Sequence, residues 1–126
     1  RRVAIHDAAR PLVPLDLLAR LEEVSRTFPV TIPGIPLVDT IKEVDEREGV
    51  LRTVPRERLR SIQTPQIFHP NVIEKFPNDA NPTDEASLAE ELGFPVRVVE
   101  GSLKNFKITW PEDLIIMERF LSGERE

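Results

Sequence analysis

Two short apolar runs near the start of the sequence enclose a stretch with helical periodicity. Val3, Ala4 and Ile5 form the first run, which has the pattern of a strand buried on both faces of a sheet. In residues 14–28, leucines and a valine recur at three- and four-residue steps, as on the packing face of an amphipathic helix. Residues 30–33 form a second candidate strand. This alternation predicts an α/β fold.

Length and composition exclude several classes of protein. At 126 residues the chain is one domain or less, and 40% apolar with 31% charged side chains is typical of a globular protein. No apolar run approaches the roughly 18 residues of a membrane span. The net charge of -5 argues against general nucleic-acid binding. The absence of cysteine excludes disulfides and thiolate chemistry and fits a reducing compartment.

The loop after the first apolar run, residues 6–11 (HDAARP), is a candidate ligand site. Ligands of open α/β sheets gather at the carboxyl ends of strands. There, Asp7 could bind Mg²⁺ or a substrate hydroxyl, and Arg10 could hold a phosphate with two hydrogen bonds. The alternative is an ion pair between Asp7 and Arg10 that only rigidifies a turn.

Residues 101–114 predict a short strand followed by a helix. Apolar side chains at 106, 108 and 110 alternate with Lys107 and Thr109, so one strand face would be buried. Thr109 is expected to cap the helix, because threonine is favoured before a first helical turn. A lysine beside a helix start is well placed to meet a phosphate. The alternative is a solvated lysine on an edge strand.

Residues 40–44 and 50–54 flank a polar turn and predict a β-hairpin. Two strands alone are marginally stable in water, so such a hairpin must pack on something else. A partner subunit is the favoured interpretation, and packing on its own domain is the alternative.

Two threonines lie at positions where the backbone fixes the side chain. Pro65 restricts Thr64 to extended conformations, and Thr83 is expected to cap a helix that runs to Glu91. The five glycines are scattered, so no glycine-rich phosphate loop is visible. No metal-ligand cluster or nucleophilic triad is visible in the sequence either.

Several of these stretches, in their order and spacing, resemble one family: 2-C-methyl-D-erythritol 4-phosphate cytidylyltransferase, of the non-mevalonate isoprenoid pathway. The match covers nearly the whole chain. The matching segments are residues 6–11 (HDAARP), 39–40 (DT), 64–66 (TPQ), 83–86 (TDEA), 99–101 (VEG), 105–109 (NFKIT) and 111–114 (PEDL).

The resemblance implies a Rossmann-like nucleotidyltransferase sheet with a protruding β-arm, at about residues 39–60, that builds a homodimer. Residues 1–126 would be the C-terminal portion of a single cytidylyltransferase domain. The implied reaction joins CTP and methylerythritol phosphate, requires Mg²⁺ and releases pyrophosphate. The implied location is the bacterial cytoplasm, or the plastid for a plant-type source.

The same resemblance implies roles for individual residues. Lys107 would be catalytic and would stabilise negative charge on the α-phosphate under attack. The sugar-phosphate side of the site would be lined by Asp7, Arg10, Thr64, Thr83 and Lys107. Thr40 and Arg56 lie on the arm and would reach into the partner's site. Asp7 is also a candidate metal ligand.

The sequence departs from the family pattern at its start. It has no initiator methionine and begins on an apolar run, and the family's glycine-rich CTP loop is absent. We therefore expect a chain that begins within a domain and does not turn over alone. Two alternatives stay open: a ribitol-5-phosphate cytidylyltransferase, and a non-catalytic dimerisation module of the same fold.

Overall fold

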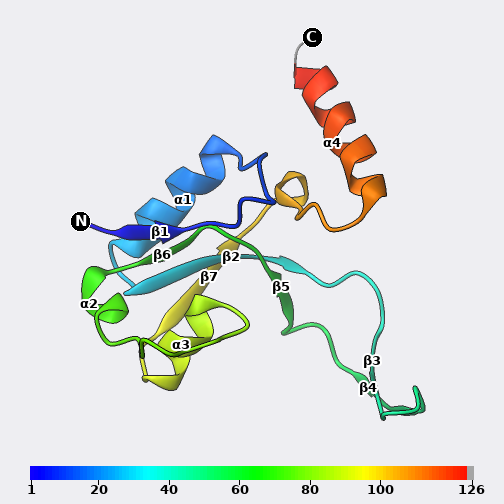
Figure 1. Cartoon of the computed structure of the whole chain (residues 1–126), viewed down its shortest axis with the longest axis horizontal. Helices are drawn as coiled ribbons and strands as arrows, with labels where there is room; N and C mark the ends of the chain where they lie inside the picture. Colours follow the sequence, from blue (N-terminus) through cyan, green and yellow to red (C-terminus); the bar gives the residue numbers. More distant parts are fainter. Residues whose placement is uncertain (125–126) are drawn as a thin grey trace.

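Strand β2 (Val30–Pro36) organises the main sheet of the computed structural model. One of its edges pairs antiparallel with β6 (Gln66–Phe68) over its first half and with β5 (Arg60–Ile62) over its second half. The other edge pairs parallel with β7 (Val96–Glu100). β1 (Val3–Ile5) pairs antiparallel with the outer edge of β6 (Figure 1).

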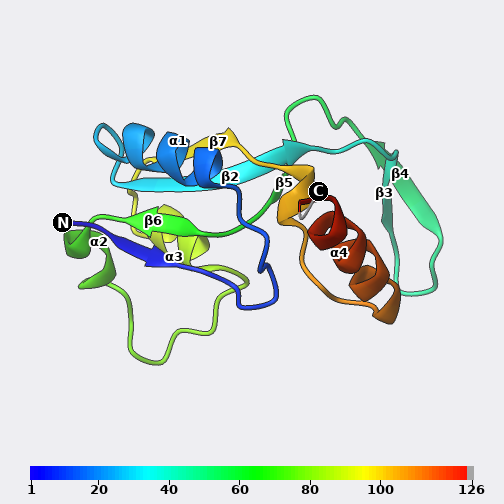
Figure 2. The ribbon, with the colours of Figure 1, turned by 90° about the horizontal axis from the view of Figure 1, so that it is seen from above.

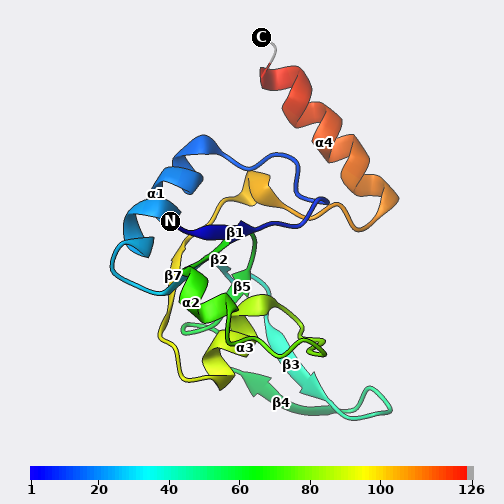
Figure 3. The same cartoon turned by 60° about the vertical axis from the view of Figure 1, so that its left-hand side comes forward.

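Helices cover both faces of this sheet, and the structure describes residues 1–124. Helix α1 (Leu15–Ser25) packs on one face, whereas α2 (Pro70–Ile73) and α3 (Glu85–Glu91) lie on the other (Figures 1 and 3). Successive strand residues point to opposite faces. Two core clusters result, one of Leu17, Leu21, Ile67 and Val99, the other of Val30, Ile32, Phe68, Val72, Ala86 and Ala89. The predicted α/β fold is confirmed.

Strand β1 is less buried than its sequence predicts. Val3 is 36% exposed, Ala4 is also exposed, and only Ile5 is partly covered. In this structure β1 pairs only with β6, at the margin of the sheet, so one of its edges has no neighbouring strand among the described residues. The prediction of a strand buried on both faces is wrong for this chain as it stands.

The predicted hairpin is confirmed as β3 (Ile41–Val44) and β4 (Val50–Val54), with Ile41 opposite Val54. The turn is closed by the Asp45 carboxylate, which accepts the backbone N–H groups of Arg47 and Gly49 at 2.9 Å each. The hydrogen bond from the Gly49 N–H, and to a smaller extent that from the Arg47 N–H, lowers the pKa of Asp45. The hairpin stands away from the main sheet, and we call it the arm (Figure 2).

The segment before the last helix is not the strand that its alternation predicts. Residues 103–105 form a short 3₁₀ turn, and residues 106–109 have no regular structure. The backbone N–H of Ile108 donates to the carbonyl of Ala9 at 2.8 Å, but no strand among the described residues lies alongside to extend a ladder. Trp110 is 68% exposed instead of buried.

Helix α4 (Pro111–Glu124) begins with a different cap from the one predicted. The Thr109 hydroxyl donates to the Lys107 carbonyl at 3.3 Å. The Asp113 carboxylate, three residues into the helix, instead accepts the backbone N–H groups of Thr109 at 2.8 Å and of Trp110 at 2.9 Å. Asp113 thus satisfies donors that a helix start leaves unpaired.

A buried set of amides joins the sheet to the segment before α4. We call the side chains of Gln63 and Asn105, together with the partly buried backbone of Ser102, the polar junction. Gln63 donates through Nε2 to the Ser102 carbonyl at 2.9 Å and accepts through Oε1 from the Ser102 N–H at 3.2 Å. Asn105 donates through Nδ2 to Gln63 Oε1 at 3.3 Å and to the Thr64 carbonyl at 2.7 Å. Asn105 is fully buried and Gln63 is 4% exposed.

The junction fills a place where the sheet is interrupted. Between β5 and β6 the Gln63 N–H still donates to the Pro33 carbonyl of β2 at 2.9 Å, and the chain leaves the ladder at Thr64–Pro65, whose peptide bond is cis. Gly101 follows β7 directly, and a Cβ on it would lie 2.5 Å from Gln63 Oε1. The side-chain amides therefore replace ladder hydrogen bonds and need the space that glycine leaves.

We predict that Asn105→Leu lowers the free energy of unfolding by about 1–3 kcal/mol, because it leaves the buried Thr64 carbonyl without its donor. Urea unfolding monitored by circular dichroism measures the change. Lys104→Leu is the control, since Lys104 is an exposed neighbour on the same 3₁₀ turn. Equal stabilities of the two variants would contradict a structural role for Asn105.

A second prediction concerns the start of α4. The N–H groups of Trp110 and Thr109 lower the pKa of Asp113, so its stabilising contribution is present above the ordinary aspartate pKa and is lost as pH falls through the lowered value. At neutral pH, Asp113→Ala should speed amide exchange of residues 109 and 110 severalfold. Asp113→Asn should retain part of the protection, because its amide oxygen still accepts. Unchanged exchange in Asp113→Ala would rule out this cap.

Candidate functional site

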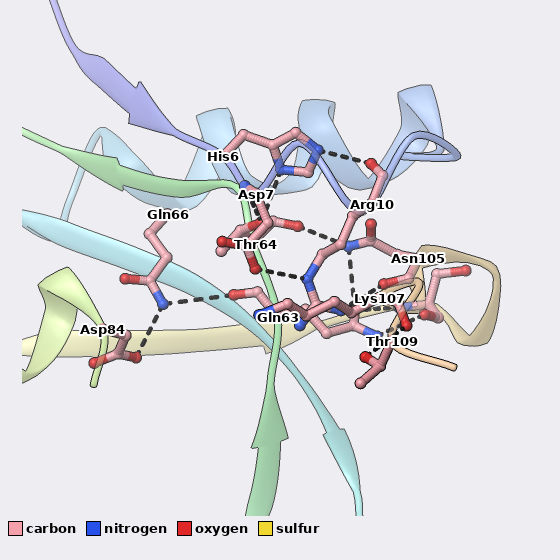
Figure 4. Close-up of polar contacts among 11 residues, drawn as sticks. His6, Asp7, Arg10, Gln63, Thr64, Gln66, Asp84, Asn105, Lys107 and Thr109 are labelled. Carbon is pink, nitrogen blue, oxygen red and sulfur yellow. Dashed lines mark hydrogen bonds and ion pairs between the residues drawn. The ribbon is translucent and has the colours of Figure 1, made fainter. Parts of the chain in front are cut away.

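A cavity of about 440 Å³ lies where four segments meet: the loop after β1, the break between β5 and β6, the loop before α3, and the segment before α4. Figure 4 shows its polar side chains converging from these segments. It contains five of the residues singled out from the sequence. The full lining is Asp7, Arg10, Ile62, Gln63, Thr64, Gln66, Asn81, Pro82, Thr83, Asp84, Glu85 and Lys107.

Arg10 is held by two acceptors. Its Nε lies 3.2 Å from Asp7 Oδ2, and its Nη1 donates to the Asn105 carbonyl at 2.8 Å. The ion pair predicted as the structural alternative is therefore present. The Arg10 side chain is 11% exposed, and Nη2 has no hydrogen-bond partner among the described residues. The pairing thus orients the guanidinium and leaves one nitrogen for a ligand.

Lys107 lies on the irregular segment before α4. The neighbouring Ile108 N–H donates to the Ala9 carbonyl, which holds this segment beside the loop after β1. Lys107 is exposed, and its ammonium makes no ion pair with the residues that the structure describes. It is therefore a free cation at the cavity, placed by backbone contacts instead of by a strand.

Thr64 and His6 connect the loop after β1 to the sheet break. The Asp7 backbone N–H donates to Thr64 Oγ1 at 2.9 Å. His6 Nδ1 lies 2.8 Å from the same oxygen, and His6 Nε2 lies 2.8 Å from the Arg10 carbonyl oxygen (Figure 4). Thr64 itself is 8% exposed, so the conformation of its hydroxyl is constrained from two sides.

Asp84, and not Thr83, caps α3. Its Oδ1 accepts the Ser87 N–H at 2.9 Å and its Oδ2 accepts from Gln66 Nε2 at 3.1 Å. Gln66 Oε1 accepts the Ala86 N–H at 3.1 Å, which ties β6 to the helix start. Thr83 precedes the cap by one residue and is exposed, so its hydroxyl is left for the cavity. The predicted cap was wrong by one position because aspartate is also a good N-cap.

Thr40 and Arg56 do not reach this cavity within one chain. They line a separate pocket of about 420 Å³ at the base of the arm, together with Arg60 and Glu57. The arm projects away from the loop after β1 (Figure 1). A single chain therefore brings Asp7, Arg10, Thr64, Thr83 and Lys107 together and leaves the two arm residues apart.

The carboxylates of the cavity do not form a metal cage. Residues 1–124 contain no group of three or more His, Cys, Asp or Glu side chains that could hold a metal ion. Asp84 uses both oxygens within the protein, and Arg10 occupies one oxygen of Asp7. Mg²⁺ commonly takes only one or two protein carboxylates and fills its other positions with phosphate and water. Asp7 as a ligand of this kind stays a prediction.

Four polar residues of this region were not identified as functional from the sequence: His6, Gln63, Gln66 and Asn105. Gln63 and Gln66 flank Thr64–Pro65 within an extended apolar segment, where two amides without a solvent-facing pattern indicate buried hydrogen bonding. Asn105 carries no such indication.

Among the described helices, none has the length and apolar composition to cross a membrane.

The sequence similarity to known proteins extends over the segments that form this cavity and over the arm. The family model for 2-C-methyl-D-erythritol 4-phosphate cytidylyltransferase matches residues 1–123. A relative of that name from Frankia casuarinae is 45% identical over 123 residues, which are 95% of this chain and 46% of the relative. One from Dehalococcoides mccartyi is 42% identical over 125 residues, which are 98% of this chain and 55% of the relative. The chain spans about half the length of these curated relatives.

Solved structures similar to this chain carry names of the same family. A structure described as 4-diphosphocytidyl-2C-methyl-D-erythritol synthase is 34% identical with a TM-score of 0.84, over 95% of this chain and 56% of that one. The 2-C-methyl-D-erythritol 4-phosphate cytidylyltransferase from Thermus thermophilus is 38% identical with a TM-score of 0.78, over 94% of this chain and 61% of that one. The predicted nucleotidyltransferase-type fold is confirmed. The chain belongs to the 2-C-methyl-D-erythritol 4-phosphate cytidylyltransferase family.

Proposed function

We propose that this chain forms the polyol-phosphate side of the active site of a cytidylyltransferase. The complete enzyme joins CTP and 2-C-methyl-D-erythritol 4-phosphate to give 4-diphosphocytidyl-2-C-methyl-D-erythritol and pyrophosphate. The observation that carries the proposal is the shared cavity of Lys107, Arg10 and the Thr64 and Thr83 side chains. The matching relatives bear this substrate in their names, and none of those reported above is named for ribitol phosphate.

The chemistry of the cavity fits a transfer that needs no protein nucleophile. An oxygen of the substrate phosphate attacks the α-phosphorus of CTP, a new P–O bond forms, and the bond to the β-phosphate breaks to release pyrophosphate. Positioning and charge neutralisation lower such a barrier. Lys107 supplies a mobile ammonium for the charge that develops on the α-phosphate, and Arg10 supplies a fixed guanidinium nitrogen.

The nucleotide pocket lies outside this chain in our proposal. The five glycines, at positions 34, 49, 93, 101 and 123, are too scattered to form a phosphate-binding loop. Mg²⁺ would supply positive charge that neutralises part of the charge of the triphosphate. In this chain, Asp7 is the side chain that would hold it. The chain alone should bind the polyol phosphate without turning it over.

We also propose a homodimer with composite active sites. The arm strands are largely exposed, with Val50 and Leu51 each 61% exposed, and a two-stranded hairpin is marginally stable alone. Packing on a second copy would cover these side chains and carry Thr40 and Arg56 to the partner's cavity. We place the enzyme in the cytoplasm, with the plastid as the alternative for a plant-type source.

Replacing Lys107 tests the catalytic proposal. In the complete enzyme, Lys107→Ala should lower kcat by about a hundredfold to a thousandfold, the loss that follows removal of one charge-stabilising donor. Stability should be unchanged, because Lys107 is exposed. Pyrophosphate release from CTP and methylerythritol phosphate measures the rate, and thermal unfolding measures stability.

Lys104→Ala is the matched control for this experiment. Lys104 is an exposed lysine three residues away, and its Nζ lies 5.7 Å from the centre of the Phe120 ring, outside the cavity lining. It should keep near wild-type turnover. Wild-type turnover in Lys107→Ala would support the non-catalytic module instead.

A higher kcat/KM for ribitol 5-phosphate than for methylerythritol phosphate would overturn the proposed substrate.

Mixed dimers test the composite site. An Arg56→Ala subunit retains Lys107, and a Lys107→Ala subunit retains Arg56, so a mixed dimer holds one intact site if the arm serves its partner. Equal mixing of the two inactive variants should restore roughly a quarter of wild-type activity, since half of the dimers are mixed and each has one good site. No recovery, with subunit exchange confirmed by mass spectrometry, would show that Arg56 serves its own chain or neither site.

A further inference from the structure

The imidazole of His6 lies between two oxygens that differ in what they can offer. Its Nε2 is 2.8 Å from the Arg10 carbonyl oxygen, and its Nδ1 is 2.8 Å from Thr64 Oγ1. A carbonyl oxygen can only accept a hydrogen bond, whereas a hydroxyl can donate or accept. The carbonyl therefore determines which nitrogen of the neutral ring carries the proton. That nitrogen is Nε2, and Nδ1 is left as an acceptor.

This tautomer determines what the Thr64 hydroxyl can do. Because Nδ1 accepts, the hydroxyl proton of Thr64 must point to His6. The Asp7 N–H already donates to the same oxygen at 2.9 Å, which uses one of its two lone pairs. One lone pair is left, and no proton is left to donate. Toward the cavity, Thr64 is then an acceptor only.

We propose that His6 is a positioning residue that makes Thr64 the acceptor for a hydroxyl group of the substrate's polyol chain, and not a donor to its phosphate. This deepens the proposed function and rests on it for the identity of the substrate. A phosphate oxygen brings lone pairs, which would face the remaining lone pair of Thr64. A substrate hydroxyl brings a proton that completes the three hydrogen bonds of the threonine oxygen.

The assignment divides the cavity into two parts. Lys107 and the free nitrogen of Arg10 are donors suited to phosphate. Thr64, with its proton held by His6, is suited to a neutral hydroxyl. A site that hydrogen-bonds a substrate hydroxyl discriminates against analogues without it, because its own polar group is then unpaired. His6 would thus contribute to selection of the polyol without touching it.

Nitrogen NMR of the imidazole tests the tautomer directly on this chain. In mildly alkaline buffer, His6 should show a protonated Nε2 and an unprotonated Nδ1 shifted by hydrogen bonding. Thr64→Val should move the Nδ1 resonance to its unbonded position and leave Nε2 protonated. A protonated Nδ1 in the wild-type chain, or an Nδ1 resonance insensitive to Thr64→Val, would overturn the proposal.

Steady-state kinetics of the complete enzyme test the consequence. His6→Phe keeps a ring and removes both hydrogen bonds, so KM for methylerythritol phosphate should rise about threefold to tenfold, the size of one net hydrogen bond. KM for CTP and kcat should change little. His6→Asn places an amide oxygen near the position of Nδ1 and should recover most of the loss. A rise in both KM values, or no recovery in His6→Asn, would reject the positioning role.

A double-mutant cycle separates action through Thr64 from a general effect on folding. If His6 acts only by holding the Thr64 proton, His6→Phe should cost nothing further in a Thr64→Val background. Equal losses in both backgrounds would overturn the proposal. The two proposals fail separately: absent turnover with CTP would reject the cytidylyltransferase function and leave the tautomer result standing, whereas normal turnover with a protonated Nδ1 would reject only this inference.

Discussion

The buried amide contacts of Gln63 and Asn105 hold the site together. They join the break between β5 and β6, Ser102 in the loop after β7, and the 3₁₀ turn before α4, which are three segments without strand pairing to one another. Breaking a buried hydrogen bond costs about 1–3 kcal/mol when one partner is left unpaired. This is a large part of the stability of a small domain. The backbone carbonyl of Asn105 also accepts a hydrogen bond from Arg10 Nη1, so one residue contributes both to the fold and to the position of a candidate ligand-binding cation.

A site made of irregular backbone has a physical advantage. Ladder-paired residues must direct alternate side chains to opposite faces, which limits how many can converge on one ligand. Loops avoid this limit, but their polar groups then need other partners. Here the amide and carboxylate side chains of Gln63, Gln66, Asp84 and Asn105 serve as those partners. They fix the loops and leave Thr83 and Lys107 available to the cavity.

The regular elements were predictable because their patterns depend on local spacing. Helix α1, strand β2 and the arm follow from the repeat of Leu17 and Leu21, the apolar run from Val30, and the polar turn. The alternation of apolar and polar side chains that ends at Trp110 also has the pattern of a strand. No neighbouring strand in residues 1–124 pairs with it, however. The buried position of Asn105 and the contact of His6 with Thr64 depend on segments distant in sequence, so spacing could not reveal them.

The charge of the cavity bears on the proposal that two chains complete the site. Its lining contains the carboxylates of Asp7, Asp84 and Glu85 and the two cations Arg10 and Lys107, so negative charge is in excess by one. Internal hydrogen bonds screen Asp84 and the ion pair neutralises Asp7, but a phosphate dianion meeting a triphosphate still needs further positive charge. In the proposed dimer, Arg56 of a second copy would supply part of it, and a divalent cation would supply the rest. The excess of negative charge in the lining thus supports the proposed composite site, because one cavity alone lacks the cations that two phosphate groups need.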